Sequence, residues 1–215
     1  MNELKYLNIC YDTSKHDDNF NNLICIYLNQ VFNYSIQNEL FDLLHNNDIH
    51  LIIINYDMEL LKSIRLLNEH IQIIVFLDKL NNEHLLNSLT FQYTKFIEKI
   101  NCINEFIYIL KDCVRNIDSR KSNILQLKNN FIYDTYNKTL FKENKIIPLT
   151  KKEKLFLDLL IYETNKVLSY AQINKEIWSN TMSPNALRSL IKEIRKKTYK
   201  DLIKNVSGMG YRIDL

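Results

Sequence analysis

The sequence predicts a two-domain protein: a parallel, doubly wound α/β sheet, then an α+β unit with a helix-turn-helix and a two-stranded wing. In the first part, short apolar runs alternate with helix-length stretches. In the second, four short strand candidates precede three capped helices and a glycine-containing hairpin. A chain of 215 residues, 46% of them hydrophobic, is long enough for two domains of about 100 residues each.

The first domain is predicted from three short apolar runs, at residues 7–11, 51–54 and 71–76, and a weaker fourth at residues 95–97. Runs without a polar alternation are typical of strands buried on both faces of a sheet. Helix-length stretches lie around them, at residues 17–30, 37–45, 60–68, 82–89 and 104–116. This alternation predicts parallel strands joined by helices.

A polar segment at residues 118–123 is the predicted linker, and it separates a domain of residues 1–117 from one of residues 124–215. The second domain opens with four brief strand candidates, at residues 124–127, 131–134, 139–142 and 145–147. Asparagine-bearing turns lie between them, which indicates an antiparallel meander.

Three helices follow, and each begins with a capping signal. These signals are Thr150 with Glu153, Ser169 with Gln172, and Ser183 followed by Pro184. The first two are capping boxes, and the third pairs an N-cap serine with a first-turn proline. The helices are predicted to end near residues 163, 178 and 198, with Asn165 as a left-handed residue after the first.

The third helix has one apolar stripe, at the i, i+3, i+4 and i+7 positions occupied by Leu187, Leu190, Ile191 and Ile194. The opposite face carries Asn185, Arg188, Ser189, Lys192, Glu193 and Lys196. Arginine and asparagine can form bidentate bonds with base edges, while Lys192, Arg195, Lys196 and Lys197 suit phosphates. An ordinary basic, solvent-exposed helix would show the same pattern.

Both glycines of the chain, Gly208 and Gly210, lie in the final hairpin. Glycine reaches positive φ without steric cost, so their position predicts a tight turn with a required shape. Charge is also unevenly distributed. Residues 1–123 hold 11 basic and 16 acidic residues, a net −5, and residues 124–215 hold 17 basic and 9 acidic, a net +8. A basic second domain favours a polyanionic partner.

These residues resemble the winged-helix DNA-binding domains of OmpR/PhoB-type response regulators. The resemblance rests on Leu149-Thr150-x-x-Glu153, Trp178, Ile191-Lys192-x-Ile194-Arg195-Lys196-Lys197 and Val206-x-Gly208-x-Gly210-Tyr211-Arg212. It implies a transcriptional regulator of a two-component system that binds double-stranded DNA, with the third helix in the major groove and the wing at the adjacent minor groove. It also implies that the loop of residues 179–182 can contact RNA polymerase.

Carried over to this chain, the resemblance implies two sets of DNA-binding residues. Those on the third helix are Asn185, Arg188, Ser189, Lys192, Arg195 and Lys196; those near the DNA backbone are Lys204, Asn205, Ser207 and Tyr211. The chain departs from the family at Ser207, where many members have a basic residue, and at Glu193, which is often arginine. Glu193 could accept a bond from a cytosine amino group or be screened by its basic neighbours.

The first domain resembles the flavodoxin-like receiver of that family, but it lacks most of the phosphorylation chemistry. Phosphorylation needs a carboxylate nucleophile after the third strand, an acidic pair for Mg²⁺, a hydroxyl and a lysine. The corresponding residues are Asn55, then Thr13 and Ser14, then Leu77, with Lys99 as the retained lysine and Ile100 after it. A register shift would make Asp12 or Asp57 a replacement, and Asp57 is the alternative phosphoacceptor of a conventional regulator.

We therefore expect a homodimer that forms without aspartate phosphorylation, with no cofactor, no metal and no enzymatic activity. Family members dimerise through the fourth helix, fifth strand and fifth helix. Here Lys95, Lys111 and Arg115 remain of the charged lattice, and an apolar contact through Leu85, Leu89, Phe91 and Phe106 is an alternative to a core role for these residues.

A second hypothesis is a regulator whose first domain senses a ligand or a redox change. Its cysteines are Cys10, Cys25, Cys102 and Cys113, which show no CxxC pairing and lie in apolar surroundings that suit reduced, buried thiols. A third is a winged helix that binds protein. Without an apolar run of membrane-spanning length or a secretory signal, the sequence favours a cytoplasmic protein with no membrane partner.

Overall fold

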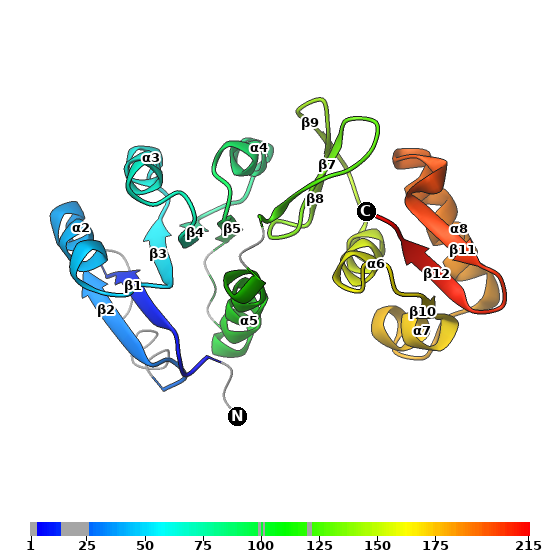
Figure 1. Ribbon diagram of the computed structural model, residues 1–215, viewed down its shortest axis with the longest axis horizontal. Coiled ribbons are helices and arrows are strands. Elements are labelled where there is room, and N and C mark those ends of the chain that lie inside the picture. Colours follow the sequence, from blue (N-terminus) through cyan, green and yellow to red (C-terminus); the bar gives the residue numbers. More distant parts are fainter. Residues whose placement is uncertain (1–3, 14–25, 99, 101, 120–121) are drawn as a thin grey trace. The chain divides into compact units, whose positions relative to one another are not determined.

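The computed structural model describes residues 4–13, 26–98, 100, 102–119 and 122–215 (Figure 1). The chain divides into two compact units, Met1–Asn123 and Ile124–Leu215. No helix in the described ranges combines the length and the apolar character that a bilayer crossing needs.

The first unit is a five-stranded sheet in which every pairing is parallel. The strands stand in the order β2-β1-β3-β4-β5, with β1 Asn8–Asp12, β2 Gln30–Tyr34, β3 Leu51–Asn55, β4 Gln72–Leu77 and β5 Thr94–Glu98. The described helices are α2 (Gln37–Asn46), α3 (Met58–Leu67), α4 (Asn82–Thr90) and α5 (Ile103–Ser119). This topology confirms the predicted flavodoxin-like, doubly wound sheet.

Helices cover both faces of this sheet, with α2, α3 and α4 on one face and α5 on the other (Figure 1). Alternate residues of the central strands serve the two cores. Ile53 packs with Phe106 and Leu110 of α5, while Ile52 and Ile54 pack with the residues of the opposite helices. Burial on both sides explains why β3 reads as an uninterrupted apolar run.

Strand β2 was not predicted. Of the helix expected at residues 17–30, residues 17–25 lie outside the described part of the chain, and Gln30 is the first residue of β2. As an edge strand, β2 is fully buried only at Tyr34, and Gln30 and Asn33 are exposed. It therefore lacks the continuous apolar run that identified its neighbours.

The first unit ends inside the range expected for the linker. Helix α5 continues to Ser119, two residues into the range expected for the linker. Asn123, the last residue of the unit, is fully buried, and its Oδ1 accepts a hydrogen bond from the backbone N–H of Tyr93 at 2.6 Å. A polar residue predicted as linker is thus fixed within the first unit.

The second unit begins with an antiparallel sheet in the order β6-β7-β8-β9, formed by Ile124–Gln126, Phe131–Asp134, Thr139–Lys142 and Lys145–Ile147. It continues with α6 (Lys151–Tyr162), β10 (Leu168–Ser169), α7 (Tyr170–Trp178), α8 (Pro184–Lys197), the 3₁₀ helix η1 (Lys200–Leu202), β11 (Ile203–Val206) and β12 (Gly210–Ile213). Strand β10 was not predicted, and it makes the second sheet three-stranded, in the order β10-β12-β11.

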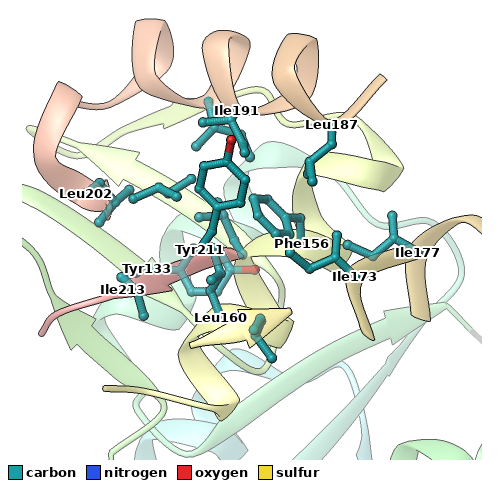
Figure 2. Packing of buried hydrophobic residues seen from close by; sticks show 14 of the residues in the cluster. Tyr133, Phe156, Leu160, Ile173, Ile177, Leu187, Ile191, Leu202, Tyr211 and Ile213 are labelled. Atoms are coloured by element: carbon teal, nitrogen blue, oxygen red, sulfur yellow. The ribbon is translucent and has the colours of Figure 1, made fainter. Parts of the chain in front are cut away.

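Helix α8 lies over a core that all parts of this unit supply. Figure 2 shows Leu187 and Ile191 directed from α8 toward Phe156 of α6 and Tyr211 of β12. Leu187, Ile191 and Ile194 are buried as the periodicity predicted, and Leu190 is partly buried against the same cluster.

Two of the three predicted caps are present as hydrogen bonds. Thr150 and Glu153 form a reciprocal capping box on α6, and Ser169 and Gln172 form another on α7. Helix α8 does begin at Pro184, but the side chain of Ser183 makes no capping bond, contrary to the prediction. The fixed φ of a first-turn proline is already suited to starting a helix.

Glycine is needed at positions 208 and 210 for different structural reasons. Gly208 has φ of +74° in the turn, where an added Cβ would meet nothing within 4 Å. Gly210 pairs with Ser169 of β10, and a Cβ there would lie 1.9 Å from the carbonyl oxygen of Leu168. The tight hairpin therefore explains Gly208, whereas Gly210 is required by the close approach of a neighbouring strand.

We expect Gly210→Ala to lower the free energy of unfolding much more than Gly208→Ala. The change at Gly208 costs about 1 kcal/mol through backbone strain, and the change at Gly210 costs at least about 2–3 kcal/mol because backbone must move. Urea unfolding of the full chain measures both. Equal losses in the two variants would contradict the close-approach explanation.

Candidate nucleic-acid interface

The outer face of α8 presents polar side chains to solvent. Asn185, Arg188, Ser189 and Lys192 are all exposed, as the sequence predicted for the face opposite the apolar stripe. Within the described residues, the side chains of Arg188 and Lys192 make no hydrogen bond or ion pair. Both cations are therefore available to an external partner.

A groove of about 390 Å³ runs beside this face, and its lining is mainly cationic. It is formed by Arg188, Ile191, Lys192, Arg195, Lys196, Lys200 and Tyr211. Tyr211 is only 9% exposed, and its ring meets that of Tyr170 edge to face with ring centroids 5.9 Å apart. Such a hollow suits an anionic group of the size of a phosphate.

Lys200 is a member of this groove that the sequence did not identify. It lies in η1, between α8 and the hairpin, in a segment without a helical period or a recognised motif. The one sequence signal that placed Lys200 near the predicted DNA-binding residues was its position shortly after the basic end of α8. The fold brings it beside Lys196 and Arg195 in the lining of the groove.

Several other basic residues of the predicted set are bound inside the unit. Arg195 donates from its guanidinium to the carbonyl oxygen of Ile203, which ties α8 to β11. Lys196 pairs with Glu193 at 2.8 Å, one turn away on the same helix. The basic charge counted from the sequence therefore overstates what a partner can use.

Lys197, which the sequence assigned to phosphates, makes contacts inside the unit. Its Nζ lies 2.7 Å from the Glu153 carboxylate and donates to the carbonyl oxygen of Pro148. The Glu153 side chain is 3% exposed and also accepts from the backbone N–H of Thr150. This ion pair joins the first turn of α6 to the last turn of α8.

Asp214 forms ion pairs with two basic residues of the hairpin. Lys204 lies 2.6 Å from its carboxylate and Arg212 lies 2.9 Å away. The hydrogen bond from Lys204 is the main cause that lowers the pKa of Asp214, and the charge of Arg212 adds to it. Asn205 and Ser207 are exposed on the same hairpin.

Glu193 is the acidic residue on the outer face of α8. Its hydrogen bond with Lys196 is the main cause that lowers its pKa, and the nearby charges of Lys196, Lys192 and Lys197 act in the same direction. Of the two readings of Glu193, this contact fits screening by basic neighbours. Lys196 keeps an exposed side chain in this pair.

The loop between α7 and α8 is the remaining exposed part of this region. Ser179 and Asn180 have positive φ values of 49° and 68°, and both are exposed. The start of the loop caps the end of α7, because the backbone N–H of Asn180 donates to the carbonyl oxygen of Asn174. The loop is thus short, has a defined backbone conformation and is accessible to a partner.

In the first unit, the residue at the end of β3 is Asn55, and it is buried with Asp12. The Asn55 Nδ2 donates to Asp12 Oδ2 at 2.7 Å, and the Asn55 Oδ1 is buried without a hydrogen-bond partner among the described residues. Asp12, which a register shift would make a replacement for the acidic pair, is therefore the acidic side chain beside Asn55. Leu77 is buried in the core.

Asp57 is occupied as a helix cap. Its Oδ1 accepts from the backbone N–H groups of Glu59 and Leu60 at 3.0 Å each, and this satisfies the first turn of α3. This role explains its presence without phosphorylation chemistry. Ser14 and Lys99 lie outside the described residues.

The cysteines are only partly as expected. Cys10 and Cys113 are buried, but Cys102 is exposed, so the prediction of a buried thiol is wrong there; Cys25 lies outside the described residues. Burial raises the pKa of Cys10 to about 12, which leaves it protonated at neutral pH. In the described ranges, no group of three or more His, Cys, Asp or Glu side chains is placed to hold a metal ion.

Two residues of the apolar contact considered for dimerisation belong to the core. Phe106 is fully buried against the sheet and Phe91 is 9% exposed. Lys95 is bound to Asp112 at 3.3 Å, from β5 to α5, with little of either side chain exposed. Leu85 and Leu89 on α4 remain partly exposed.

Comparison with known proteins places the second unit in a family. The sequence model of the family described as transcriptional regulatory protein, C terminal, matches residues 143–213. Response regulator protein PmrA of Pseudomonas aeruginosa is 34% identical over 70 residues, 32% of each chain. Transcriptional regulatory protein QseB of Haemophilus influenzae is 30% identical over 82 residues, 37% of each chain. The matches thus span about a third of these relatives' lengths.

The fold of the whole chain has a counterpart among solved structures. The response regulator DrrB, a Thermotoga maritima OmpR/PhoB homologue, is similar with a TM-score of 0.65, and the similarity covers 99% of this chain and 100% of that one. At 18% identity, this likeness shows the fold alone.

The fold is therefore that of a two-domain response regulator, with a receiver-like sheet and a winged helix. The match in the second unit agrees with its predicted resemblance to OmpR/PhoB-type response regulators, since residues 143–213 fit the family model and both relatives are bacterial regulators. The sequence-based prediction of this fold is confirmed.

The internal role of Lys197 can be separated from any role in binding by comparing it with its neighbour. We expect Lys197→Met to lower the free energy of unfolding by about 3 kcal/mol, because it leaves the buried Glu153 carboxylate without its cation. Lys196→Met breaks only an exposed pair and should cost less than about 1 kcal/mol. Chemical denaturation measures both, and equal effects would contradict the assigned difference.

Proposed function

We propose that this chain is a DNA-binding transcriptional regulator that acts as a homodimer without aspartate phosphorylation. In this proposal residues 1–117 form the receiver-like domain, residues 118–123 the connection, and residues 124–215 the DNA-binding domain. The observation that carries it is the cationic groove beside the exposed face of α8. A regulator of chromosomal DNA works in the cytoplasm, and the proposal assigns the chain no enzymatic reaction.

The contacts inside the unit support a division of labour among the predicted DNA-binding residues. Arg188 and Asn185 have the chemistry for bidentate contacts with guanine and adenine, and Ser189 is exposed on the same helix. Lys192 and Lys200 suit phosphates along the groove. Arg195 acts chiefly by holding β11, and Lys196 contributes a charge that Glu193 reduces.

The hairpin is the second contact in this proposal. Asn205 and Ser207 are exposed near its turn, and Lys204 is held by Asp214. Without a basic residue at Ser207, the hairpin is suited to DNA backbone contacts through hydrogen bonds. Tyr211 lines the groove, and the exposed loop of residues 179–182 is the surface that we assign to RNA polymerase.

The absence of phosphorylation is proposed from the chemistry of Asn55 and Asp57. A carboxamide cannot accept a phosphoryl group as a carboxylate does, and the Asn55 amide already bonds with Asp12. Asp57 is committed to capping α3. Dimerisation would then supply the gain in affinity, because two linked DNA-binding units raise the effective concentration at a two-part site.

DNA binding is tested with the full chain on genomic promoter fragments. We expect Arg188→Ala and Lys192→Ala each to weaken binding at least about tenfold, and Lys192→Ala also to reduce the salt dependence of the binding constant by about one counterion. Neither side chain supports the fold, so unfolding curves should not change.

Glu193→Gln is the matched control for charge on the same helix. It removes an anion and releases Lys196, so it should strengthen non-specific binding. Fluorescence anisotropy over a range of salt concentrations measures all three variants. Wild-type affinity in both Arg188→Ala and Lys192→Ala would reject α8 as the DNA-binding helix.

Independence from phosphorylation is tested by adding acetyl phosphate and Mg²⁺ to the purified protein. We expect an unchanged intact mass and an unchanged sedimentation coefficient, that of a dimer, before and after treatment. A mass increase of one phosphoryl group, or a monomer that dimerises only after treatment, would contradict the proposal.

A further inference from the structure

The first unit contains a groove that belongs neither to the DNA-binding face nor to the Asn55 end of the sheet. It has a volume of about 580 Å³ and lies between the C-terminal half of α3 and the segment that joins α4 to β5. Because the strands are parallel, this segment lies at the end where β5 begins, whereas Asn55 is the last residue of β3. Pockets for small molecules are typically about 300–1,000 Å³.

The walls of the groove are apolar and aromatic. Leu66 of α3 is 88% exposed, and Phe91 and Tyr93 lie on the other side. The ring of His70 lies over that of Tyr93, with centroids 5.3 Å apart and planes tilted by 31°. A single exposed leucine is ordinary on a protein surface, but here it adjoins aromatic rings around a hollow.

The aromatic wall is held in place before any molecule binds. Tyr93 has a positive φ of 58°, which is unusual for a residue with a bulky side chain. Its N–H donates to Asn123 Oδ1 at 2.6 Å, and its carbonyl oxygen accepts from the N–H of Ile73 at 2.9 Å. Backbone strain kept by surrounding bonds is a frequent property of binding sites.

The α3 wall is fixed as well. The Arg65 guanidinium donates to the carbonyl oxygens of Asn68 and Ile71 and to Thr94 Oγ1. These bonds connect α3 to the segment that precedes β4 and to the first residue of β5. Both walls are therefore preorganised, which reduces the entropy that binding would cost.

The charges around the groove favour an anion. Lys62 and Arg65 lie one turn apart on α3 and both line it, and Glu69 is the one acidic side chain of the lining. Lys62 is half exposed and pairs with Glu59 on the same helix at 2.7 Å. A surface pair of this kind is weak enough for Lys62 to move to an anionic group in the groove.

We propose that this groove binds a small planar aromatic anion, with the ring between Leu66 and Tyr93 and the acidic group near Lys62. The ligand would contact Gln92 and Tyr93. These two residues are hydrogen-bonded to Ser122 and Asn123, the last residues before the second unit. Asn123 accepts from Tyr93, and the Ser122 hydroxyl donates to Gln92 Oε1 at 2.6 Å. The proposal does not depend on DNA binding.

The test uses the full-length chain without DNA and 8-anilinonaphthalene-1-sulfonate, a planar aromatic sulfonate, as the probe. We expect saturable binding of one molecule per chain by fluorescence titration and calorimetry. Leu66→Ala should weaken it at least about fivefold, and Lys62→Gln should weaken it and lower its salt dependence.

Leu67→Ala is the matched control. Leu67 is the next residue of α3 and is 64% exposed, but it does not line the groove. Its substitution should leave the affinity unchanged, and all variants should keep the wild-type unfolding midpoint. The proposal is wrong if binding is not saturable, if several molecules bind with equal affinity, or if Leu66→Ala and Leu67→Ala weaken binding equally.

Discussion

The burial of one apolar stripe on α8 determines the rest of the candidate nucleic-acid interface. Leu187, Ile191 and Ile194 can leave water only by facing the core of α6, α7 and the three-stranded sheet. Once they do, a helix of 3.6 residues per turn must turn Arg188 and Lys192 outward. The position of the cationic face is thus a consequence of hydrophobic packing, and the charges themselves need not direct it.

That packing requires two close approaches, which the sequence meets with particular residues. At one end of α8, the nearly buried Glu153 carboxylate is shared by Lys197 and the first turn of α6. On the sheet, only a glycine at position 210 lets β12 approach the Leu168 carbonyl. From the sequence alone, Lys197 in its basic run and Gly210 in the hairpin are both expected to serve DNA binding. In the structure, each makes a contact that the packing of the unit requires.

The sequence was sufficient for elements with a strong local signal. The apolar run of β3, the capping boxes of α6 and α7 and the stripe of α8 each follow from a few neighbouring residues. It was insufficient where tertiary contacts decide. The edge strand β2 is half exposed and has no apolar run, β10 has two residues, and Lys200 joins the groove only because η1 folds back beside α8. Likewise, nothing local distinguishes Lys197 from Lys196, although one is internal and the other is exposed.

The pair formed by Asp12 and Asn55 shows how one substitution changes the chemistry of a whole site. A carboxylate at position 55 would place two like charges within hydrogen-bond distance, an arrangement that requires a cation or a proton. The amide of Asn55 instead donates a hydrogen to Asp12, so a single charge is left and it is already stabilised. A site satisfied in this way has less need of a bound cation, and the amide at position 55 is not itself a nucleophile for a phosphoryl group. Under the proposed function, the first unit then acts through its surfaces. A second copy of the chain binds one surface, and a small aromatic molecule binds another.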